Sequence, residues 1–573
     1  MKKLMTICMF ITSSILCSQV QFENVATNVG INITGPQDLK LGGVSFYDFD
    51  NDGWDDLTFA CKGDIPVKFF KNISGSFVEQ DFNLNISGHS KQVIWVDYDN
   101  DGDNDLFVTK LDGVNKLYQN DGSFIFSDVT TSAGFSNNVL VTYGASFGDF
   151  NNDGYLDLFL NNKDIDKVIP NMLYKNNGNG TFTDVSISSQ ISPVGHLSFC
   201  SVFFDFNNDG YQDIYISNDR IDNTNILYKN NGDETFTDVS ISSGTGISAN
   251  AMSTTIGDYN KDGWFDIYVT NTIEGNYLLK NKGDGTFTNA AVETETVFNT
   301  ISWGAVFFDA DNDIDLDLYV SSMMTDTSAG MLPSGFFICD ENLEYSIPTN
   351  VGFQNDDYIS FANAIGDFNN DGKPDIVVVN QAPDNHALWG NQSINSNNWI
   401  KIKLEGITSN KNGVGNRIEI FANGVSQYRY TICGEGFLGQ NSNYEFVGLS
   451  SATNIDYIKV TWNNTGITET INNIQPNQAI TIQEGNGVLS TSNELIDDFR
   501  IYPNPSQTGV YQFANLSSEK YTIQIYTTSG KLVLSKTIRN NRDQLELNTF
   551  SKGIYIAKII SKNGTLIKKL IHN

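Results

Sequence analysis

Short apolar runs separated by polar turns extend along most of this chain of 573 residues. Between residues 92 and 129 four such runs follow one another, at 92–97, 105–110, 115–119 and 124–129. Alternation with a period of two residues and short connections predict antiparallel strands. The pattern occurs seven times, at intervals of 49 to 58 residues. A four-stranded repeat of about 50 residues has the size of one β-propeller blade. The sequence therefore predicts an all-β fold with a seven-bladed propeller.

An acidic loop of nine residues joins the first two runs of every repeat. Positions 1, 3, 5 and 9 of the loop are Asp or Asn in all seven copies, and position 6 is Gly in six of them. Calcium takes oxygen ligands, and alternate side chains of a tight loop can converge on one ion while Gly permits the positive φ of the turn. The residue at position 7 would add its backbone carbonyl. The candidate calcium ligands are Asp48, Asp50, Asp52, Trp54, Asp56, Asp97, Asp99, Asp101, Asp103, Asp105, Asp149, Asn151, Asp153, Tyr155, Asp157, Asp205, Asn207, Asp209, Tyr211, Asp213, Asp258, Asn260, Asp262, Trp264, Asp266, Asp309, Asp311, Asp313, Asp315, Asp317, Asp367, Asn369, Asp371, Lys373 and Asp375.

A metal-free Asp/Asn-Gly turn and an EF-hand are the alternative interpretations of these loops. Turn residues alone explain one copy, but carboxylates packed this closely repel one another unless a cation neutralises them, and the loop occurs seven times. An EF-hand loop ends in Glu at position 12 between helices, whereas these loops end in Asp at position 9 before an apolar run. The sixth loop has Ile314 in place of Gly, which makes the turn costlier. We therefore expect six to seven calcium sites.

The closure of the ring can be predicted from the start of the chain. The fourth run of a repeat has the form Phe-x-Asp-Val, as in Phe182 to Val185, and Phe22 to Val25 has a similar form before the first repeat begins. The seventh repeat ends after Trp389 without such a run. We therefore expect the N-terminal strand to complete the seventh blade, which would remove two exposed sheet edges.

These repeats resemble the FG-GAP or VCBS repeat family, which includes the propeller of the integrin α-subunit. The resemblance covers about residues 20–395 and implies a propeller with calcium loops at the positions given above. It implies no particular ligand or reaction, because one fold hosts many functions.

The first 18 residues have the features of a secretory signal peptide. Lys2 and Lys3 precede an apolar stretch and the small Ser18, and we expect cleavage before Gln19. Lipidation at Cys17 is a less favoured alternative, because Leu16 is larger than the residue expected before a lipidated Cys. No later segment is apolar enough to span a bilayer.

The segment of residues 396–484 lacks acidic loops and is predicted to be a small β-sandwich-like domain. Its phrases from Gly413 to Ile418 and from Gly434 to Gln440 resemble the ASPIC/UnbV domain, which follows such repeats in cartilage acidic protein. Asn416 stands where a small residue is usual, and Phe446-Val-Gly-Leu departs from the usual Phe-Gly-Leu-Gly. The resemblance implies the domain but no biochemical role.

A polar linker, residues 485–498, precedes a second small β domain at residues 499–573. The phrase from Ile501 to Pro505 and the motifs Ser529-Gly530-Lys531 and Lys552 to Tyr555 resemble the type A sorting domain of the type IX secretion system of Bacteroidota. The resemblance implies passage through the outer membrane by the type IX machinery, removal of the domain, and release or attachment to the cell surface. A domain that only caps the chain is the alternative.

The charge distribution separates this last domain from the rest. The whole chain has a net charge of −32, whereas residues 499–573 carry 11 Lys and Arg against three Asp and Glu. A strongly acidic body makes nucleic acid an improbable partner. Of the 28 side-chain ligand positions, 24 are Asp, so bound calcium would neutralise much of the acidity.

The sequence contains little that suggests a catalytic site. His89 and His196 precede first strands, and a lone loop histidine is more often solvated than catalytic. No nucleophile elbow, zinc-binding helix motif or P-loop is present. Isolated buried thiols are favoured over disulfides for Cys61, Cys200, Cys339 and Cys433. For the aromatic residues of the first strands, Trp95, Trp303, Phe46 and Phe203, core packing is favoured over sugar stacking.

Two function classes follow from these observations. The preferred one is a secreted or surface-attached, monomeric and non-catalytic calcium-binding protein that presents one propeller face to a glycan or protein. The alternative is a secreted polysaccharide lyase or hydrolase that uses residues at the mouth of the propeller channel. A mouth lined by Arg, Tyr and His would favour the enzyme, and a flat face of Asn, Ser and Tyr would favour binding.

Overall fold

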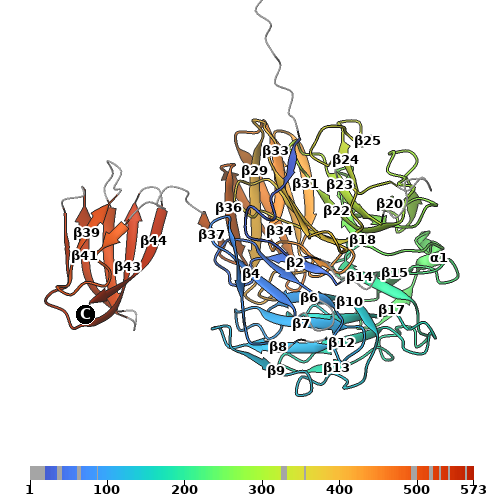
Figure 1. Ribbon diagram of the computed structural model, residues 1–573, viewed down its shortest axis with the longest axis horizontal. Coiled ribbons are helices and arrows are strands. Elements are labelled where there is room, and N and C mark those ends of the chain that lie inside the picture. The colour runs from blue at the N-terminus through green and yellow to red at the C-terminus, as the bar shows by residue number, and fades with distance from the viewer. Residues whose placement is uncertain are drawn as a thin grey trace, which may run out of the picture. The chain divides into compact units, whose positions relative to one another are not determined.

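The computed structural model describes residues 20–34, 42–60, 66–84, 86, 88–323, 332–353, 356–491, 500–514, 521–527, 531–539, 543–561 and 564–572. The predicted signal peptide (1–18), Cys61 and residues 492–498 of the predicted linker lie outside these ranges. The chain forms two compact units, residues 1–489 and residues 490–573. Both are built from β-strands, and Figure 1 labels most of them.

Seven sheets of the first unit carry the acidic loops, each between two antiparallel strands, the first two of its repeat. The first three sheets contain β2 (Val44–Tyr47), β3 (Asp56–Phe59), β4 (Lys68–Asn72) and β5 (Phe77–Gln80); β6 (Ser90–Val96), β7 (Asp105–Lys110), β8 (Lys116–Asn120) and β9 (Phe126–Asp128); and β10 (Thr142–Gly148), β11 (Asp157–Asn162), β12 (Met172–Asn176) and β13 (Phe182–Asp184). The fourth and fifth contain β14 (Ser198–Phe204), β15 (Asp213–Asn218), β16 (Ile226–Asn230) and β17 (Phe236–Asp238), followed by the helical turn α1 (Ser240–Ser243); and β18 (Thr254–Gly257), β19 (Asp266–Val269), β20 (Tyr277–Asn281) and β21 (Phe287–Asn289). The sixth and seventh contain β22 (Ser302–Phe308), β23 (Asp317–Ser322), β24 (Gly335–Cys339) and β25 (Tyr345–Ser346); and β26 (Ser360–Gly366), β27 (Asp375–Asn380), β28 (Ala387–Asn391) and β1 (Phe22–Asn24). The four strands predicted for the second repeat are confirmed to within two residues at each end.

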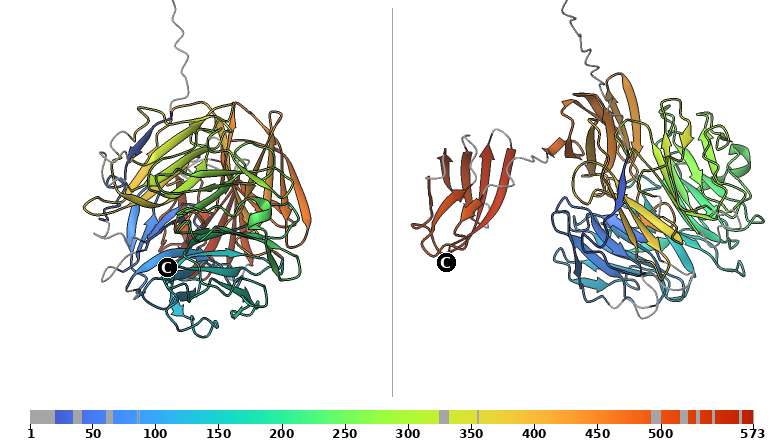
Figure 2. Two further views of the ribbon diagram at one scale, coloured as in Figure 1. Left: turned by 90° about the vertical axis from the view of Figure 1, so that its right-hand side faces the viewer. Right: turned by 45° about the horizontal axis from the view of Figure 1, so that its top comes forward.

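The first strands of these sheets lie innermost. All seven residues of β6 are buried, whereas the last strand of the same sheet, β9, is half-buried to exposed. The first strands of consecutive sheets are neighbours, and β26 is in turn a neighbour of β2. The sheets therefore follow one another in a closed, propeller-like cycle, with hydrophobic cores between adjacent sheets (Figure 2).

The N-terminal strand closes this cycle, as predicted. Residues Phe22, Glu23 and Asn24 of β1 pair antiparallel with Asn391, Gly390 and Trp389 of β28. Phe22 and Val25 are buried, at 1% and 9% exposure. Strand β1 therefore covers the open edge of the last sheet, which would otherwise be available for aggregation.

Residues 398–491 form two further four-stranded sheets around one core. They contain β29 (Asn398–Glu405), β30 (Arg417–Ala422), β31 (Val425–Tyr430), β33 (Glu445–Ser450), β34 (Ile455–Trp462), β35 (Ile467–Ile474), β36 (Gln478–Gln483) and β37 (Gly487–Thr491). The linker predicted from residue 485 begins later, because β37 pairs with β36. Gly485 and Gly487 have φ values of 75° and 69°, which suit the tight connection between β36 and β37, so the first residues of the predicted polar linker belong to a hairpin.

A segment of this part enters the space enclosed by the first strands. We call residues Cys433–Ser442 the central segment; it includes the short strand β32 (Gly439–Gln440), which pairs in parallel with β2. The backbone of Cys433 accepts a hydrogen bond from Phe147 at 2.9 Å, and Gly436 donates one to Thr254 at 2.9 Å. Ser442 donates another to Ile365 at 3.0 Å. The partners belong to β10, β18 and β26, so the central segment bridges sheets on different sides of the ring.

The second unit contains a three-stranded and a four-stranded sheet. Their strands are β38 (Arg500–Tyr502), β39 (Val510–Ala514), β40 (Tyr521–Thr527), β41 (Leu532–Ile538), β42 (Leu545–Glu546), β43 (Gly553–Ser561) and β44 (Gly564–His572). The two sheets share a core that includes Tyr511, Ile523 and Leu570. No helix among the described residues is long and apolar enough to cross a membrane.

Candidate metal centres in the acidic loops

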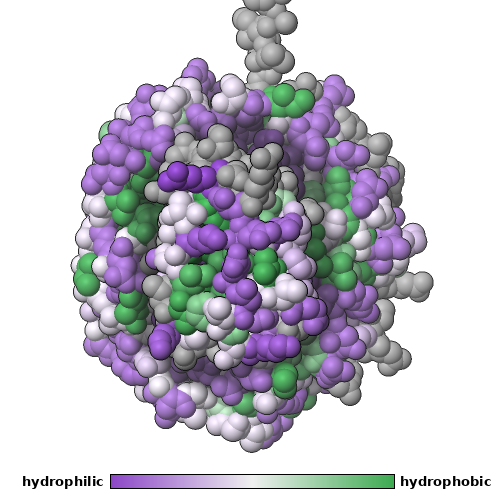
Figure 3. Space-filling model, turned by 90° about the vertical axis from the view of Figure 1, so that its left-hand side faces the viewer, coloured by the Kyte–Doolittle hydropathy of each residue, from purple (hydrophilic) through white to green (hydrophobic). Residues whose placement is uncertain are grey.

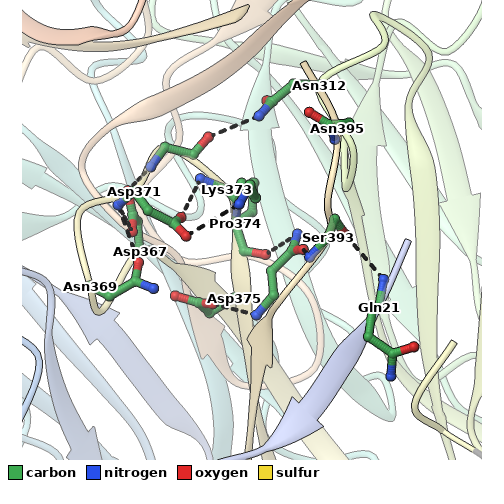
Figure 4. Close-up of polar contacts among 12 residues, drawn as sticks. Gln21, Asn312, Asp367, Asn369, Asp371, Lys373, Pro374, Asp375, Ser393 and Asn395 are labelled. Carbon is green, nitrogen blue, oxygen red and sulfur yellow. Dashed lines mark hydrogen bonds and ion pairs between the residues drawn. The ribbon is translucent and has the colours of Figure 1, made fainter. Parts of the chain in front are cut away.

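The aspartate at position 1 shapes every acidic loop. Its two carboxylate oxygens accept the backbone N–H groups of positions 5 and 6, at 2.8 to 3.1 Å in all seven loops. The carboxylate at position 5 accepts the N–H of position 7 at 2.9 to 3.1 Å. These contacts bend the backbone around its own carboxylates, as Figure 4 shows for Asp367 and Asp371 of the seventh loop.

The aspartate at position 9 is the first residue of the second strand and is the most deeply buried. One of its oxygens accepts the N–H of the residue that ends the third strand, at 2.7 to 2.9 Å in every sheet. The residue at position 9 is 0% or 1% exposed in all seven sheets. The carboxylate at position 9 is thus held in a fixed place by a neighbouring strand before any cation binds.

The oxygen atoms that remain suit a divalent cation. One oxygen of Asp50 and one of Asp99, both at position 3, are buried without a hydrogen-bond partner among the described residues. In the three loops that have Asp at position 3, carboxylate oxygens lie within 4.8 Å of one another: Asp48, Asp50 and Asp56; Asp97, Asp99 and Asp101; Asp309, Asp311 and Asp317. Converging hard oxygen atoms on a tight loop are the ligand set of calcium.

The pKa values of these carboxylates show that their ionised forms are unfavourable without a cation. Burial raises the pKa of Asp48 and Asp97 to about 7, and neighbouring carboxylates add to the effect. Burial likewise raises the pKa of Asp56 and Asp105 to about 9. A bound cation would stabilise the ionised forms and remove this penalty.

The sixth loop keeps the geometry although it lacks the Gly. Ile314 has a φ of 97°, a conformation that is strained for a β-branched residue. Its N–H still donates to Asp309 at 2.8 Å. The predicted cost of the turn is therefore present in the backbone, while Asp309 accepts the same two backbone hydrogen bonds as position 1 of the other loops.

Asparagines outside the predicted ligand set connect the loops, and no role was predicted for them from the sequence. The side chain at position 4 donates to the carbonyl of position 6 in the next loop, at 2.8 to 3.3 Å, for Asn100, Asn152, Asn208, Asn312 and Asn370. The bond from Asn370 to Gly53 closes the series from the last loop to the first. A second set at the end of the third strand, for example Asn230, donates to the carbonyl of Phe150 in the preceding sheet. The repetition of Asn at both positions was the signal that could have revealed them.

Residues 396–484 cover the acidic loops. The ammonium group of Lys401 lies 2.9 Å from a carboxylate oxygen of Asp367, and both side chains are buried. Arg417 contacts Asn208 and Gly263, at 2.7 and 2.8 Å. The backbone N–H of Asp97 donates to the side chain of Asn412 at 2.8 Å. The two domains predicted as separate thus belong to one compact unit, and the loop face of the ring is occupied by the same chain.

The cysteines, histidines and aromatic residues singled out in the sequence lie partly in the core and partly near the surface. Cys200, Cys339 and Cys433 are free and buried, as predicted. His89 pairs with Asp112, and His196 contacts Asn223 at 3.0 Å. Trp95, Phe46 and Phe203 are core residues, 0% to 1% exposed. Trp303 differs, since it is only half-buried and lines a cavity at the starts of the first strands.

Family models match three parts of the chain. An FG-GAP-like repeat model matches residues 48–108, 97–160, 161–216, 205–269 and 258–320. The ASPIC and UnbV model matches residues 406–489, and the model of a secretion system C-terminal sorting domain matches residues 500–573. No curated protein sequence matches the chain significantly.

Several solved structures are distantly similar to the chain. The extracellular domain of the putative one component system BT4673 from B. thetaiotaomicron is 12% identical with a TM-score of 0.38; the match covers 97% of this chain and 60% of that one. Saccharomyces cerevisiae Sqt1 is 11% identical with a TM-score of 0.38, covering 65% and 98% of the two chains. The SapL1 lectin, in complex with alpha methyl fucoside, is 10% identical with a TM-score of 0.33, covering 55% and 98%. At TM-scores of 0.33 to 0.38, these similarities do not indicate a function for the chain. The chain thus consists of FG-GAP-like repeats, an ASPIC/UnbV domain and a type IX C-terminal sorting domain, and the last of these indicates export to the cell surface or secretion.

Proposed function

We propose that the chain is a calcium-stabilised, seven-bladed β-propeller that works outside the cell as a non-catalytic binding protein for a glycan or a protein. The repeated geometry of the acidic loops is the observation that carries the calcium part, and FG-GAP repeats are often calcium-binding. The side chains at positions 1, 3, 5 and 9 and the carbonyl at position 7 would hold six to seven ions. Bound calcium would neutralise the carboxylates and fix the links between adjacent sheets.

The binding part rests on what the ring leaves exposed. The loop face is covered by residues 396–484, so a partner would meet the opposite face or the outer rim. The side of the molecule drawn in Figure 3 is mainly hydrophilic, and its hydrophobic patches are small and separate.

The enzyme alternative would place a lyase or hydrolase site at a mouth of the channel. The central segment fills the channel, and its Leu438 is fully buried. The cavity at the end opposite the acidic loops includes Tyr143 and Arg220 but no His. A channel mouth lined by Arg, Tyr and His would favour an enzyme, and of these only Arg and Tyr are present here. Binding without catalysis is therefore the better supported function.

Thermal unfolding with and without calcium tests the metal assignment. With a dissociation constant near 10⁻⁴ M, millimolar calcium contributes roughly 1.4 kcal/mol per loop and about 8 kcal/mol over six independent loops. A calcium chelator should therefore lower the melting temperature sharply. The melting temperature should stay low even when magnesium is present in excess, because the loops are proposed to be specific for calcium. Melting that is unchanged by the chelator, together with no metal by elemental analysis, would disprove the assignment. An array of glycans and matrix proteins probed with calcium-loaded protein then tests the binding part.

A further inference from the structure

A cavity of about 220 Å³ lies at the end of the ring opposite the acidic loops. It is lined by residues at the starts of the inner strands, among them the second residues Lys91 of β6, Tyr143 of β10, Phe199 of β14, Trp303 of β22 and Phe361 of β26. The acidic loops follow the last residues of these strands. The cavity is therefore separate from the candidate metal centres by the length of a strand.

Aromatic rings form much of the wall. Tyr143 and Phe199 meet edge to face with ring centroids 5.1 Å apart, and Phe199 and Trp303 are 5.8 Å apart. Phe437, from the central segment, lies 4.8 Å from Trp303 and 5.5 Å from Phe199. The ASPIC/UnbV domain thus contributes a residue to a cavity at the far end of the ring.

One polar group of this wall has no partner. The indole N–H of Trp303 is buried and has no hydrogen-bond partner among the described residues. A buried donor without a partner is costly, so a ligand or water that accepts this hydrogen bond would be favoured.

The charges at the cavity are positive in a strongly acidic protein. Lys91, Lys163 and Arg220 line it together with a single acidic residue, Asp219, whereas the net charge of the chain is −32. The Lys163 ammonium lies 3.0 Å from Asp219 and 4.4 Å from the centroid of Phe199. The Lys91 ammonium lies 4.6 Å from the centroid of Tyr143. The side chain of Arg220 is 56% exposed and lies 3.1 Å from Asp219.

We propose that this cavity binds an acidic sugar residue of an extracellular polysaccharide, a uronic acid or a sulfated sugar. Aromatic rings offer apolar faces to the C–H groups of a sugar ring, while lysine and arginine pair with its carboxylate or sulfate. The volume is below the roughly 300–1,000 Å³ of pockets for drug-sized ligands, so it suits one sugar at a chain end or branch. The inference rests on the proposed binding function and specifies its ligand.

Oligogalacturonate and its carboxyl-reduced, neutral counterpart are the probes that test it, measured by calorimetry at constant calcium. Arg220→Gln should weaken oligogalacturonate binding about tenfold, because one charge-assisted contact is lost. Lys163→Gln should weaken it at least as much. Lys175→Gln is the matched control. Lys175 lies on β12, the third strand of its sheet, where it pairs with Glu234, and it does not line the cavity. The melting temperature of each variant shows whether it folds, and Arg220 is exposed enough to be replaced safely.

Binding that is lost on carboxyl reduction and weakened by both cavity variants, but not by the control, supports the proposal. A sulfated oligosaccharide that behaves in the same way identifies sulfate as the recognised group. Equal binding of the neutral oligomer, or unchanged binding by both cavity variants, would overturn the proposal; so would preference for an acidic peptide such as polyglutamate. In each of these cases calcium-dependent melting and binding on the array still stand, so the proposed function survives. Release of reducing ends from oligogalacturonate would keep the ligand class but refute the non-catalytic function.

Discussion

At the scale of the single residue, a carboxylate at position 1 of a loop can both shape the turn and belong to an acidic cluster. Asp97, for example, accepts two backbone N–H groups of its own loop and also belongs to the cluster with Asp99 and Asp101. The hydrogen bonds hold the turn without a metal, whereas the cluster is unfavourable without one. Substitutions in the loops should therefore have calcium-dependent costs.

In calcium, Asp101→Ala should destabilise the protein more than Asp313→Ala does. Asp101 stands in a loop with Gly102, so its site is less strained than that of Asp313, which precedes Ile314 at a φ of 97°. In calcium, Asp101→Ala should lower the free energy of unfolding by about 1.4 kcal/mol, the contribution of one loop, and Asp313→Ala by less. Urea unfolding of both variants checks the order. Both differences should be smaller in chelator, where each variant loses only the hydrogen bond from the N–H of position 7; the reverse order in calcium would show that the sixth loop is the better site.

His386 should make the protein sensitive to acid. Its ring is buried against Phe59, and its Nδ1 accepts the N–H of Asn380 at 3.2 Å, which requires the neutral form. Burial lowers the pKa of His386 to about 4. Between its ordinary pKa of about 6.5 and pH 4 the unfolded chain binds a proton that the folded chain does not. The free energy of unfolding should therefore fall by up to about 3 kcal/mol as pH falls through this window.

The comparison with His386→Gln isolates this effect, because Gln can accept the same hydrogen bond but does not titrate. Urea midpoints at pH 7 and pH 5 in saturating calcium should differ more for the natural protein than for the variant. Identical differences would assign the acid sensitivity to other groups.

At the scale of elements, the central segment connects sheets that are far apart in the sequence. The side chain of Gln440 accepts hydrogen bonds from Ser45 at 2.7 Å and from the backbone N–H of Trp95 at 2.9 Å. It donates to the carbonyl of Trp95 at 2.7 Å. A single buried side chain thus satisfies inner-strand groups of two adjacent sheets.

Gln440→Leu should lower the free energy of unfolding by about 3 kcal/mol, because it leaves buried partners of three hydrogen bonds unsatisfied. Gln475→Leu, at an exposed glutamine of the same domain, should change it by less than about 0.5 kcal/mol. Thermal and urea unfolding measure both. If Gln440→Leu unfolds like the natural protein, the central segment is not needed to hold the ring together.

At the scale of the whole molecule, the chain separates into a large unit and a sorting unit with opposite charge. Residues 499–573 have 11 basic and three acidic residues, and they belong to the second compact unit. A sorting domain with its own core can be removed without opening the first unit.

Deletion of residues 499–573 should therefore trap the protein in the periplasm and leave its calcium-dependent melting unchanged. Fractionation of cells and medium, with melting of the purified truncated protein, provides the two measurements. A truncated chain that still reaches the surface or the medium would contradict the sorting function. A truncated chain that no longer melts cooperatively would show that the domain supports the fold.

The sequence by itself determined the repeat, the acidic loops and the closing strand, because these depend on local patterns. Four oxygen side chains at fixed spacing around a Gly recur seven times, and Phe22 repeats the form of Phe182. Turn chemistry and strand alternation act over a few residues, so a pattern in the chain is enough to predict them.

Only the tertiary structure decided what happens at the centre and on the two faces of the ring. The central segment lies up to 395 residues from its partners, as Gln440 does from Ser45, and no periodicity marks such a contact. The half-buried position of Trp303 likewise depends on Phe437 and Phe361, which come from other parts of the chain. The sequence predicted where cations would bind, whereas the covered loop face and the basic cavity arise from long-range packing alone.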